Sequence, residues 1–174
     1  MSKAKLVILD CWVSPFCMRV KIALNEKGLE YEAQAEDLFG GKSELLLSSN
    51  PIYKKVPVFL HDGKPLCESI IIVNYIDETW SSPPLLPPCS YGRAQARFWA
   101  DFIDKKLEEA LGDKDYFIGT TFGFIGGFTV EAECPKFSNW MKRCLQRESV
   151  AKVVPPPEKV YEFVLMFRKM QGID

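Results

Sequence analysis

The pattern of hydrophobic and polar positions in the opening residues predicts a strand, a helix and a second strand. The stretch from Leu6 to Trp12 alternates enough to predict a strand. Ser14 and Pro15 then have the pattern of a helix N-cap and a first helical residue, and apolar residues at helical spacing lead to Gly28, where a helix would stop. Tyr31 to Asp37 predicts the second strand, so a β-α-β unit with two parallel strands is expected.

The next 40 or so residues predict a β-hairpin between two further helices. Asp62-Gly63 is a typical two-residue turn between apolar strands. Ser69 precedes a run with apolar residues on one helical face, and is expected to cap that helix. The predicted elements are a helix over 42–49, strands over 56–60 and 65–67, and a helix from Ser69 to about Trp80. The resulting order, β-α-β-α-β-β-α, is typical of an α/β, thioredoxin-like domain.

A proline-dense stretch over 81–88 separates this half of the chain from a half in which only helices are predicted. The expected organisation is a thioredoxin-like domain over 1–80, a linker over 81–89 and an all-helical domain over 90–174. Helices are predicted from Ser90 to Leu111, from Pro135 onward and from Pro157 to Met170.

Each predicted helix of the second half carries an apolar stripe, which we interpret as core packing. The residues expected to face inward are Phe98, Trp99, Phe102, Ile103 and Leu107; Phe137, Trp140, Met141, Cys144 and Leu145; and Val160, Phe163, Val164 and Phe167.

The charge balance gives no reason to expect a nucleic acid or an anionic membrane as a partner. The chain has 22 basic and 23 acidic residues and a net charge of -1. No secretory leader is apparent, and no apolar run approaches the ~20 residues that span a bilayer, so a cytoplasmic location is expected.

The cysteines and the single histidine do not predict a metal site. The six cysteines contain no CxxC pair and no zinc-like spacing. The only histidine, His61, stands beside Asp62-Gly63 and is interpreted as a turn residue. Because a Ser-His-Asp triad or a histidine-based metal site would need it, neither is expected.

Ser14 is the first candidate for chemistry. Thioredoxin-like folds place their reactive group where the first strand meets the first helix, and the helix end there favours a thiolate. Ser14-Pro15-Phe16-Cys17 has the spacing of a redox CxxC motif, with serine in place of the first cysteine. A serine cannot form a disulfide, but its hydroxyl can donate a hydrogen bond to a thiolate of a substrate. The alternative is that Ser14 is an N-cap and nothing more.

Two further clusters suggest an extended peptide ligand. Glu68 and Ser69 at a helix start would take an ammonium and a neighbouring carboxylate, which the γ-glutamyl end of glutathione provides. Pro57 is a candidate cis residue that would turn the Val56 backbone outward, to pair with the ligand like a strand. Lys42 and Lys55 would meet the other carboxylate of the ligand. Each of these residues also has a structural explanation, as an incidental acid, a capped helix or solvated surface charges.

Together these pieces resemble the tau-class glutathione transferases of plants. The resemblance runs unbroken from about residue 5 to about residue 107, and resumes at Leu111-Gly112-Asp113-Lys114, at 131–136 and along the C-terminal helices. The matching motifs are Trp12-Val13-Ser14-Pro15-Phe16 with Arg19-Val20, Glu36-Asp37-Leu38 with Lys42-Ser43, Asn50-Pro51 with 54–58, Gly63-Lys64-Pro65 with Cys67-Glu68-Ser69, 75–80, and Arg93-Ala94 with 96–99.

The resemblance implies a glutathione transferase fold and the roles of individual residues. It implies that Ser14 stabilises the glutathione thiolate, that a hydrophobic electrophile binds between the two domains, and that two copies form a homodimer. It implies no metal and no cofactor besides the co-substrate glutathione, and it suggests detoxification in a stress response. The implied glutathione-binding residues are Ser14, Phe16, Lys42, Lys55, Val56, Pro57, Glu68 and Ser69; the implied acceptor-pocket residues are Phe16 and Phe167; the implied dimer contacts are Glu78, Arg93 and Arg97.

The sequence departs from the family in the helical half. Segments that the family carries after Lys106-Leu107 and after 122–125 have no counterpart here, and the loss amounts to several dozen residues. Two explanations stay open: a chain genuinely shortened in this domain, or a sequence from which internal segments are missing.

Two other functions stay open beside the transferase. A shortened helical domain is compatible with a non-catalytic protein that binds glutathione or apolar ligands. A thiol transferase or dehydroascorbate reductase would have to use Cys17 as its nucleophile, since serine occupies position 14.

Overall fold

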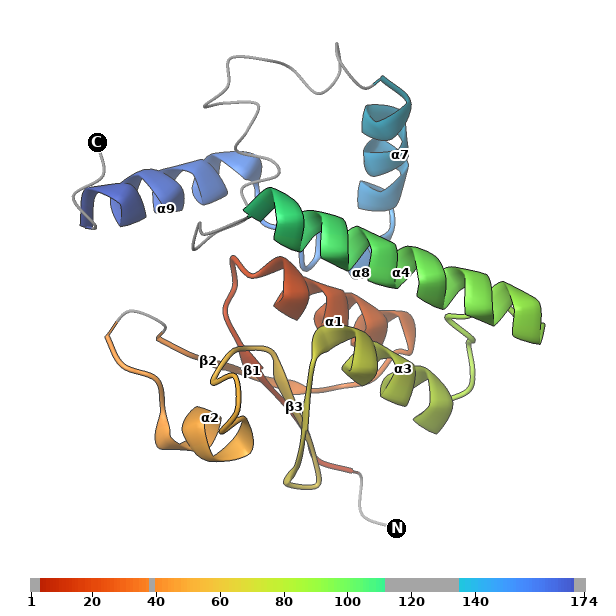
Figure 1. Cartoon of the computed structure of the whole chain (residues 1–174), viewed down its shortest axis with the longest axis horizontal. Coiled ribbons are helices and arrows are strands. Elements are labelled where there is room, and N and C mark those ends of the chain that lie inside the picture. Colours follow the sequence, from red (N-terminus) through yellow and green to blue (C-terminus); the bar gives the residue numbers. More distant parts are fainter. Residues whose placement is uncertain (1–3, 38–39, 112–134, 171–174) are drawn as a thin grey trace. The chain divides into compact units, whose positions relative to one another are not determined.

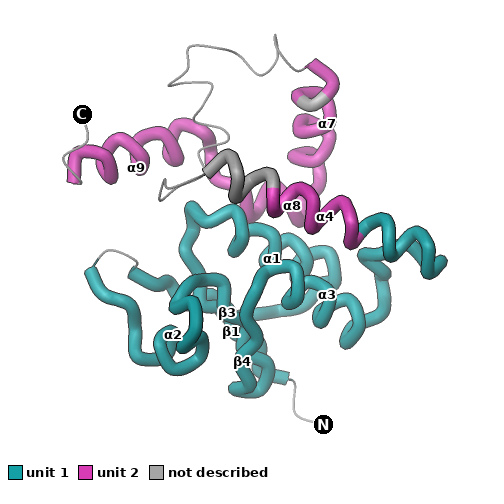
Figure 2. The backbone as a smooth tube through the Cα atoms, viewed as in Figure 1, with its two compact units in different colours: residues 1–96 teal, residues 97–174 magenta. Residues whose placement is uncertain are grey.

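The computed structural model describes residues 4–37, 40–111 and 135–170, and in Figure 1 they form a small sheet and a set of helices. Residues 1–96 form one compact unit and residues 97–174 a second, as Figure 2 shows by colour. Leu107 and Phe137, which were expected to face inward, lie outside the described side chains, and Gly112 lies outside the described residues.

The first unit is built on a mixed four-stranded sheet with the order β2-β1-β3-β4. Strand β1 pairs with β2 in parallel and with β3 in antiparallel fashion, and β3 pairs with β4 as a hairpin. The strands are β1 (Leu6–Asp10), β2 (Glu32–Ala35), β3 (Val58–His61) and β4 (Lys64–Cys67). The predicted thioredoxin-like order is confirmed, with strand ends that differ from the predicted ones by one or two residues.

Strand β1 is the centre of the unit and is buried on both faces. All five of its residues are buried, so the alternation that we inferred for it is wrong. A strand covered by helices on both sides needs apolar side chains at every position, which produces a continuous apolar run. The strand also ends at Asp10 rather than Trp12, because the chain turns there and the Ser14 N–H donates to the Cys11 carbonyl at 2.9 Å.

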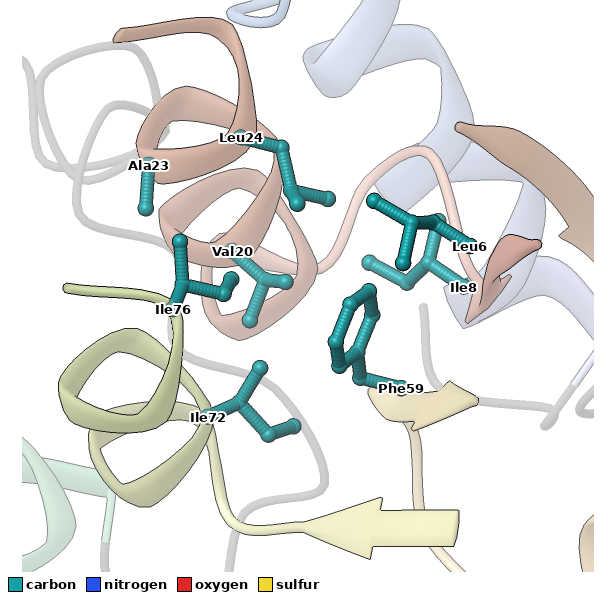
Figure 3. Close-up of a cluster of buried hydrophobic side chains, with 8 residues drawn as sticks. All are labelled: Leu6, Ile8, Val20, Ala23, Leu24, Phe59, Ile72 and Ile76. Atoms are coloured by element: carbon teal, nitrogen blue, oxygen red, sulfur yellow. The ribbon is translucent and has the colours of Figure 1, made fainter. Parts of the chain in front are cut away.

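Three helices cover this sheet: α1 (Pro15–Glu26), α2 (Glu44–Ser49) and α3 (Ser69–Thr79). Helices α1 and α3 pack together against one face, where their apolar side chains meet those of β1 and β3 (Figure 3). The other face carries Leu46 of α2, which packs with side chains of the same two strands. Helix α1 stops where predicted, with Lys27 as its C-cap and Gly28 in the left-handed region at φ 64°.

A buried ion pair joins α1, α3 and the segment that follows α3. The Lys27 ammonium donates to Asp77 Oδ1 and to the Pro83 carbonyl, and its side chain is fully buried. The same carboxylate accepts from the backbone N–H groups of Leu85 at 2.8 Å and Leu86 at 3.3 Å. This cluster therefore fixes residues 83–86 to the first unit.

His61 is not the turn residue that we expected. It is the last residue of β3, and the turn is made by Asp62 and Gly63, which both have positive φ. Its Nδ1 lies 2.7 Å from the Tyr75 hydroxyl, and its ring centroid lies 5.1 Å from that of Trp80. The histidine thus belongs to an aromatic cluster beside α3.

The described elements that follow α3 are all helices. The helices are α4 (Ser90–Leu111), which crosses the boundary between the units, α7 (Pro135–Leu145), α8 (Glu148–Ala151) and α9 (Pro157–Met170). The three predicted helix starts are confirmed. Helix α8 was missed because four residues are too short for a periodic pattern. Within the described ranges, none of the helices combines the length and the apolar character of a membrane span.

The apolar stripes of these helices are more exposed than expected. Val164 of α9 is buried, whereas Trp140 and Leu145 of α7 are exposed. On α4, four residues that were expected in the core are 43–55% exposed: Phe98, Trp99, Phe102 and Ile103. The rings of Phe98, Trp99 and Phe102 contact one another instead, stacked or edge-on, at centroid distances of 5.3–6.4 Å.

Candidate functional site

The strand register brings the predicted ligand-binding segments of the first unit to one end of the sheet. Leu9 of β1 pairs with Val58 of β3, which in turn pairs with Cys67 of β4. The chain leaves this row of residues toward Ser14, arrives in it from Val56, and leaves it again toward Glu68. The segments expected to bind the thiol, the backbone and the γ-glutamyl end of glutathione therefore lie at the same end of the sheet.

Ser14 is the N-cap of α1, as predicted. Its backbone is extended (φ -74°, ψ 118°), and its Oγ accepts from the Cys17 N–H at 3.3 Å. This contact uses a lone pair of the oxygen and leaves the O–H able to donate. The hydroxyl is thus placed at the positive end of a twelve-residue helix, a position that favours an anion.

Cys17 is unsuited to act as a nucleophile, so the thiol-transferase alternative in that form is wrong. The side chain is fully buried, and the Cys11 N–H donates to its Sγ at 3.5 Å. Burial raises the pKa of the Cys17 thiol to about 12, and the hydrogen bond with Ser14 only partly opposes this shift. A thiol that is neutral and inaccessible cannot attack a substrate.

We expect Cys17 to resist alkylation in the folded chain. Treatment with iodoacetamide at pH 8, followed by peptide mass mapping, should leave Cys17 unmodified, because about one thiol in 10⁴ is ionised at that pH. The exposed Cys89 serves as the internal control and should be modified. Modification of Cys17 at the rate of Cys89 would return it to the candidates for a nucleophile.

The start of α3 differs from the capping that we predicted. The N-cap position is Glu68, which is exposed and has a left-handed backbone (φ 69°), and no side chain caps the helix. Ser69 is the first helical residue and is buried, and its Oγ accepts from Arg19 Nη1 at 2.8 Å. Ser69 does not cap the helix, because the cap position lies one residue before it. The uncapped amides of the first turn can instead take a carboxylate.

The segment before β3 carries the expected backbone feature. The Val56–Pro57 peptide bond is cis, and Pro57 is buried while Val56 is partly exposed. Asn50, a buried residue of a matching motif to which the sequence analysis gave no role, holds this segment. Its Nδ2 donates to the Lys55 carbonyl at 3.0 Å, and its Oδ1 accepts from the Tyr53 N–H at 3.2 Å. An asparagine before proline in a turn is a signal that points to such a role.

The remaining predicted residues are found in both units. Lys42 and Lys55 are exposed on the loops that flank α2, and Phe16 lies in the first turn of α1 with the Arg19 guanidinium 5.6 Å from its ring centroid. Phe167 is half-buried in α9 of the second unit, so an acceptor pocket formed with Phe16 stays a prediction.

The three residues expected at a dimer contact lie on α3 and α4. Glu78 and Arg97 are exposed, and Arg93 donates to the Pro88 carbonyl and to Ser90 Oγ at 3.2 Å. Their role in dimerisation stays a prediction. In the described part of the chain, no group of three or more His, Cys, Asp or Glu side chains is arranged to hold a metal ion.

Comparison with known proteins decides the family. A family model described as "Glutathione S-transferase, N-terminal domain" matches residues 4–78. The chain is 46% identical to a probable glutathione S-transferase, parC, of Nicotiana tabacum, over the whole of both chains. The chain belongs to the glutathione S-transferase family. It is also 47% identical to glutathione S-transferase U19 of Arabidopsis thaliana, over 95% of this chain and 96% of that one.

Solved structures place this glutathione S-transferase in the tau class. The rice GST1 (OsGSTU1) structure, in complex with glutathione, is 38% identical, covers 98% of this chain and 99% of its own, and superposes with a TM-score of 0.85. The tau-class structure from mango, Mangifera indica, is 33% identical over 93% of this chain and 98% of its own, with a TM-score of 0.81. The resemblance and the fold class expected from the sequence are therefore confirmed.

The alignments also bear on the length of this transferase. The match with the tobacco protein spans 222 positions, whereas the chain has 174 residues, so 48 aligned positions have no residue of this chain. This agrees with the shortening inferred from the motifs, which places the gaps after residue 107 and after residue 125.

Proposed function

We propose that this chain is a glutathione transferase that joins the thiolate of glutathione to hydrophobic electrophiles. Its membership of the family supports the reaction class. The observation that carries the mechanism is the geometry of Ser14, whose hydroxyl lies at the start of α1 and accepts from the Cys17 N–H, so that its O–H can donate to a thiolate bound there.

In this mechanism Ser14 keeps the sulfur of glutathione ionised. A thiol with a pKa of ~8.5 is about 3% ionised at pH 7, and lowering that pKa by ~2 units requires about 2.7 kcal/mol of preferential stabilisation of the thiolate. A hydrogen bond to a charged group contributes about 1.5–3 kcal/mol, and a helix N-terminus adds about 0.3–1 kcal/mol. Ser14 and α1 are therefore sufficient in magnitude, and no general base is needed.

The rest of glutathione would be held by the edge of the sheet. The γ-glutamyl ammonium would meet the Glu68 carboxylate, and its carboxylate would meet the free amides at the start of α3 beside Ser69. The Val56 backbone would pair with the cysteinyl backbone of the ligand, and Lys42 and Lys55 would meet the glycyl carboxylate. The same proposal includes an acceptor pocket with Phe16 and Phe167 and a homodimer through Glu78, Arg93 and Arg97. It also includes a cytoplasmic location and a role in detoxification under stress.

Conjugation of chlorodinitrobenzene by the purified chain tests this function. The glutathione sulfur forms a bond to the ring carbon, chloride leaves with the electron pair, and the thiol proton goes to solvent. We expect turnover from a sample whose intact mass is 19.8 kDa. Retention on immobilised glutathione without turnover at that mass would replace the transferase by a binding protein. Turnover confined to a sample several kilodaltons heavier would show that this shorter chain lacks the activity.

A further inference from the structure

A carboxylate outside the proposed glutathione site closes the loop that carries Lys42. Glu36 follows β2, and its N–H donates to the Asp10 carbonyl at 2.8 Å, which continues the pairing of β1 with β2 by one residue. Its carboxylate reaches Ser43, seven residues further along: Oε1 accepts from the Ser43 hydroxyl at 2.7 Å, and Oε2 accepts from the Ser43 N–H at 3.2 Å. One side chain thus joins the end of β2 to the start of α2.

Ser43 is fixed from the helix side as well. It is the N-cap of α2, and its Oγ accepts from the Leu46 N–H at 3.0 Å. Leu46 is fully buried in the apolar cluster between α2 and the sheet. The hydroxyl therefore donates to Glu36 and accepts from Leu46, so the backbone at position 43 is held from both directions.

Lys42 immediately precedes this fixed residue and is exposed. A lysine side chain is a flexible stem of four carbons, so the position of its backbone sets the region that its ammonium can reach. We propose that Glu36 is a positioning residue for glutathione: through Ser43, it holds the backbone from which Lys42 reaches the glycyl carboxylate. The inference rests on the proposed function and adds a residue that touches no part of the ligand.

The substitution Glu36→Gln tests this role in the full-length chain. The amide keeps one oxygen for the Ser43 hydroxyl but places an NH₂ where the Ser43 N–H needs an acceptor. We expect the Kd for glutathione, measured by isothermal titration, to rise about fivefold, as loss of one modest hydrogen bond predicts. The Kd for glutathione esterified at its glycyl carboxyl should change less than about twofold, because that form gives Lys42 no carboxylate to bind.

Matched variants separate positioning from a general loss of structure. Glu44→Gln changes the same charge in the first turn of α2 and should leave both Kd values unchanged. Lys42→Ala should reproduce the pattern of Glu36→Gln, and the double variant should be no weaker than Lys42→Ala alone. If Glu36→Gln does not fold, Ser43→Ala removes the hydroxyl half of the contact and repeats the test.

The outcomes distinguish this inference from the proposed function. Equal weakening of glutathione and its ester, or no weakening of either, overturns the positioning role. Selective weakening in a chain that does not turn over chlorodinitrobenzene supports the positioning role and overturns the transferase. A failure of the unsubstituted chain to bind glutathione overturns both.

Discussion

Replacing Ser14 by alanine should lower kcat/KM for chlorodinitrobenzene about 25-fold at pH 7 and less than about twofold at pH 9. If the hydroxyl lowers the pKa of the bound thiol from ~8.5 to ~6.5, the ionised fraction at pH 7 falls from about 75% to about 3% when the hydroxyl is lost. At pH 9 most of the thiol is ionised in both proteins, so the difference nearly disappears. The measurement is a pH profile of kcat/KM with saturating glutathione, and its midpoint should rise by about two pH units.

The shape of that profile separates ionisation from other roles of Ser14. The variant also loses an N-cap, which costs about 1 kcal/mol of stability, so its melting temperature should be measured alongside. Ser14→Thr keeps a hydroxyl and should retain the lower midpoint. Ser48→Ala is the matched control, because it removes an exposed hydroxyl on α2 that donates to the Leu45 carbonyl. A loss that is equal at all pH values would show that Ser14 acts through binding or folding. Unchanged turnover would remove it from the mechanism.

The elements of the first unit were predictable because their signals are local. The cap at Ser14, the stop at Gly28 and the turn at Asp62-Gly63 each depend on a few neighbouring residues. The order of these elements then fixes the sheet, and the sheet brings the site segments to one edge. The predicted ends of the strands and the predicted burial pattern of β1 were less accurate, since both depend on what packs against the strand.

The contacts that shape the candidate site were not predictable in the same way. Arg19 donates a hydrogen bond to the Ser69 hydroxyl, although the two residues lie 50 positions apart. No residue near Ser69 in the sequence indicates this donor. Burial of Asn50 depends on the fold of the loop around it. The sequence does place these side chains near the right elements. The sequence does not show that the Ser69 hydroxyl is hydrogen-bonded to a neighbouring helix rather than left for a ligand.

The helical half shows a different limit. The stripe on α4 has the periodicity of a core-facing helix, but Phe98, Trp99 and Phe102 are exposed. Periodicity records which face is apolar, whereas its burial depends on a partner element. The pattern on α4 alone therefore does not reveal whether these side chains are buried.

Replacing Lys27 by methionine should reduce the free energy of unfolding by about 3–5 kcal/mol at neutral pH. Methionine keeps most of the buried apolar stem but leaves the Asp77 carboxylate, 12% exposed, without its ammonium partner. Urea unfolding of the full chain, followed by tryptophan fluorescence, measures the loss. Lys105→Met is the matched control, because its ion pair with Asp101 is exposed on both sides and contributes at most about 1 kcal/mol.

The pH dependence of that loss identifies the ion pair as its cause. Burial raises the pKa of Asp77, but the hydrogen bond from Lys27 and those from Leu85 and Leu86 outweigh it, so the pKa lies below its ordinary value. A carboxyl whose folded pKa is lowered stabilises the fold above its unfolded pKa of ~3.9, and this contribution is lost as the pH falls through the folded pKa. The difference between the chain and Lys27→Met should therefore be largest near neutral pH and shrink in acid, as Asp77 is protonated first in the variant, where Lys27 no longer opposes burial, and then in the unsubstituted chain. A double variant with Asp77→Leu should lose less stability than the two single losses combined, because each single change leaves a partner unsatisfied. A difference that persists unchanged at pH 3 would mean that Lys27 acts through its bond to the Pro83 carbonyl instead.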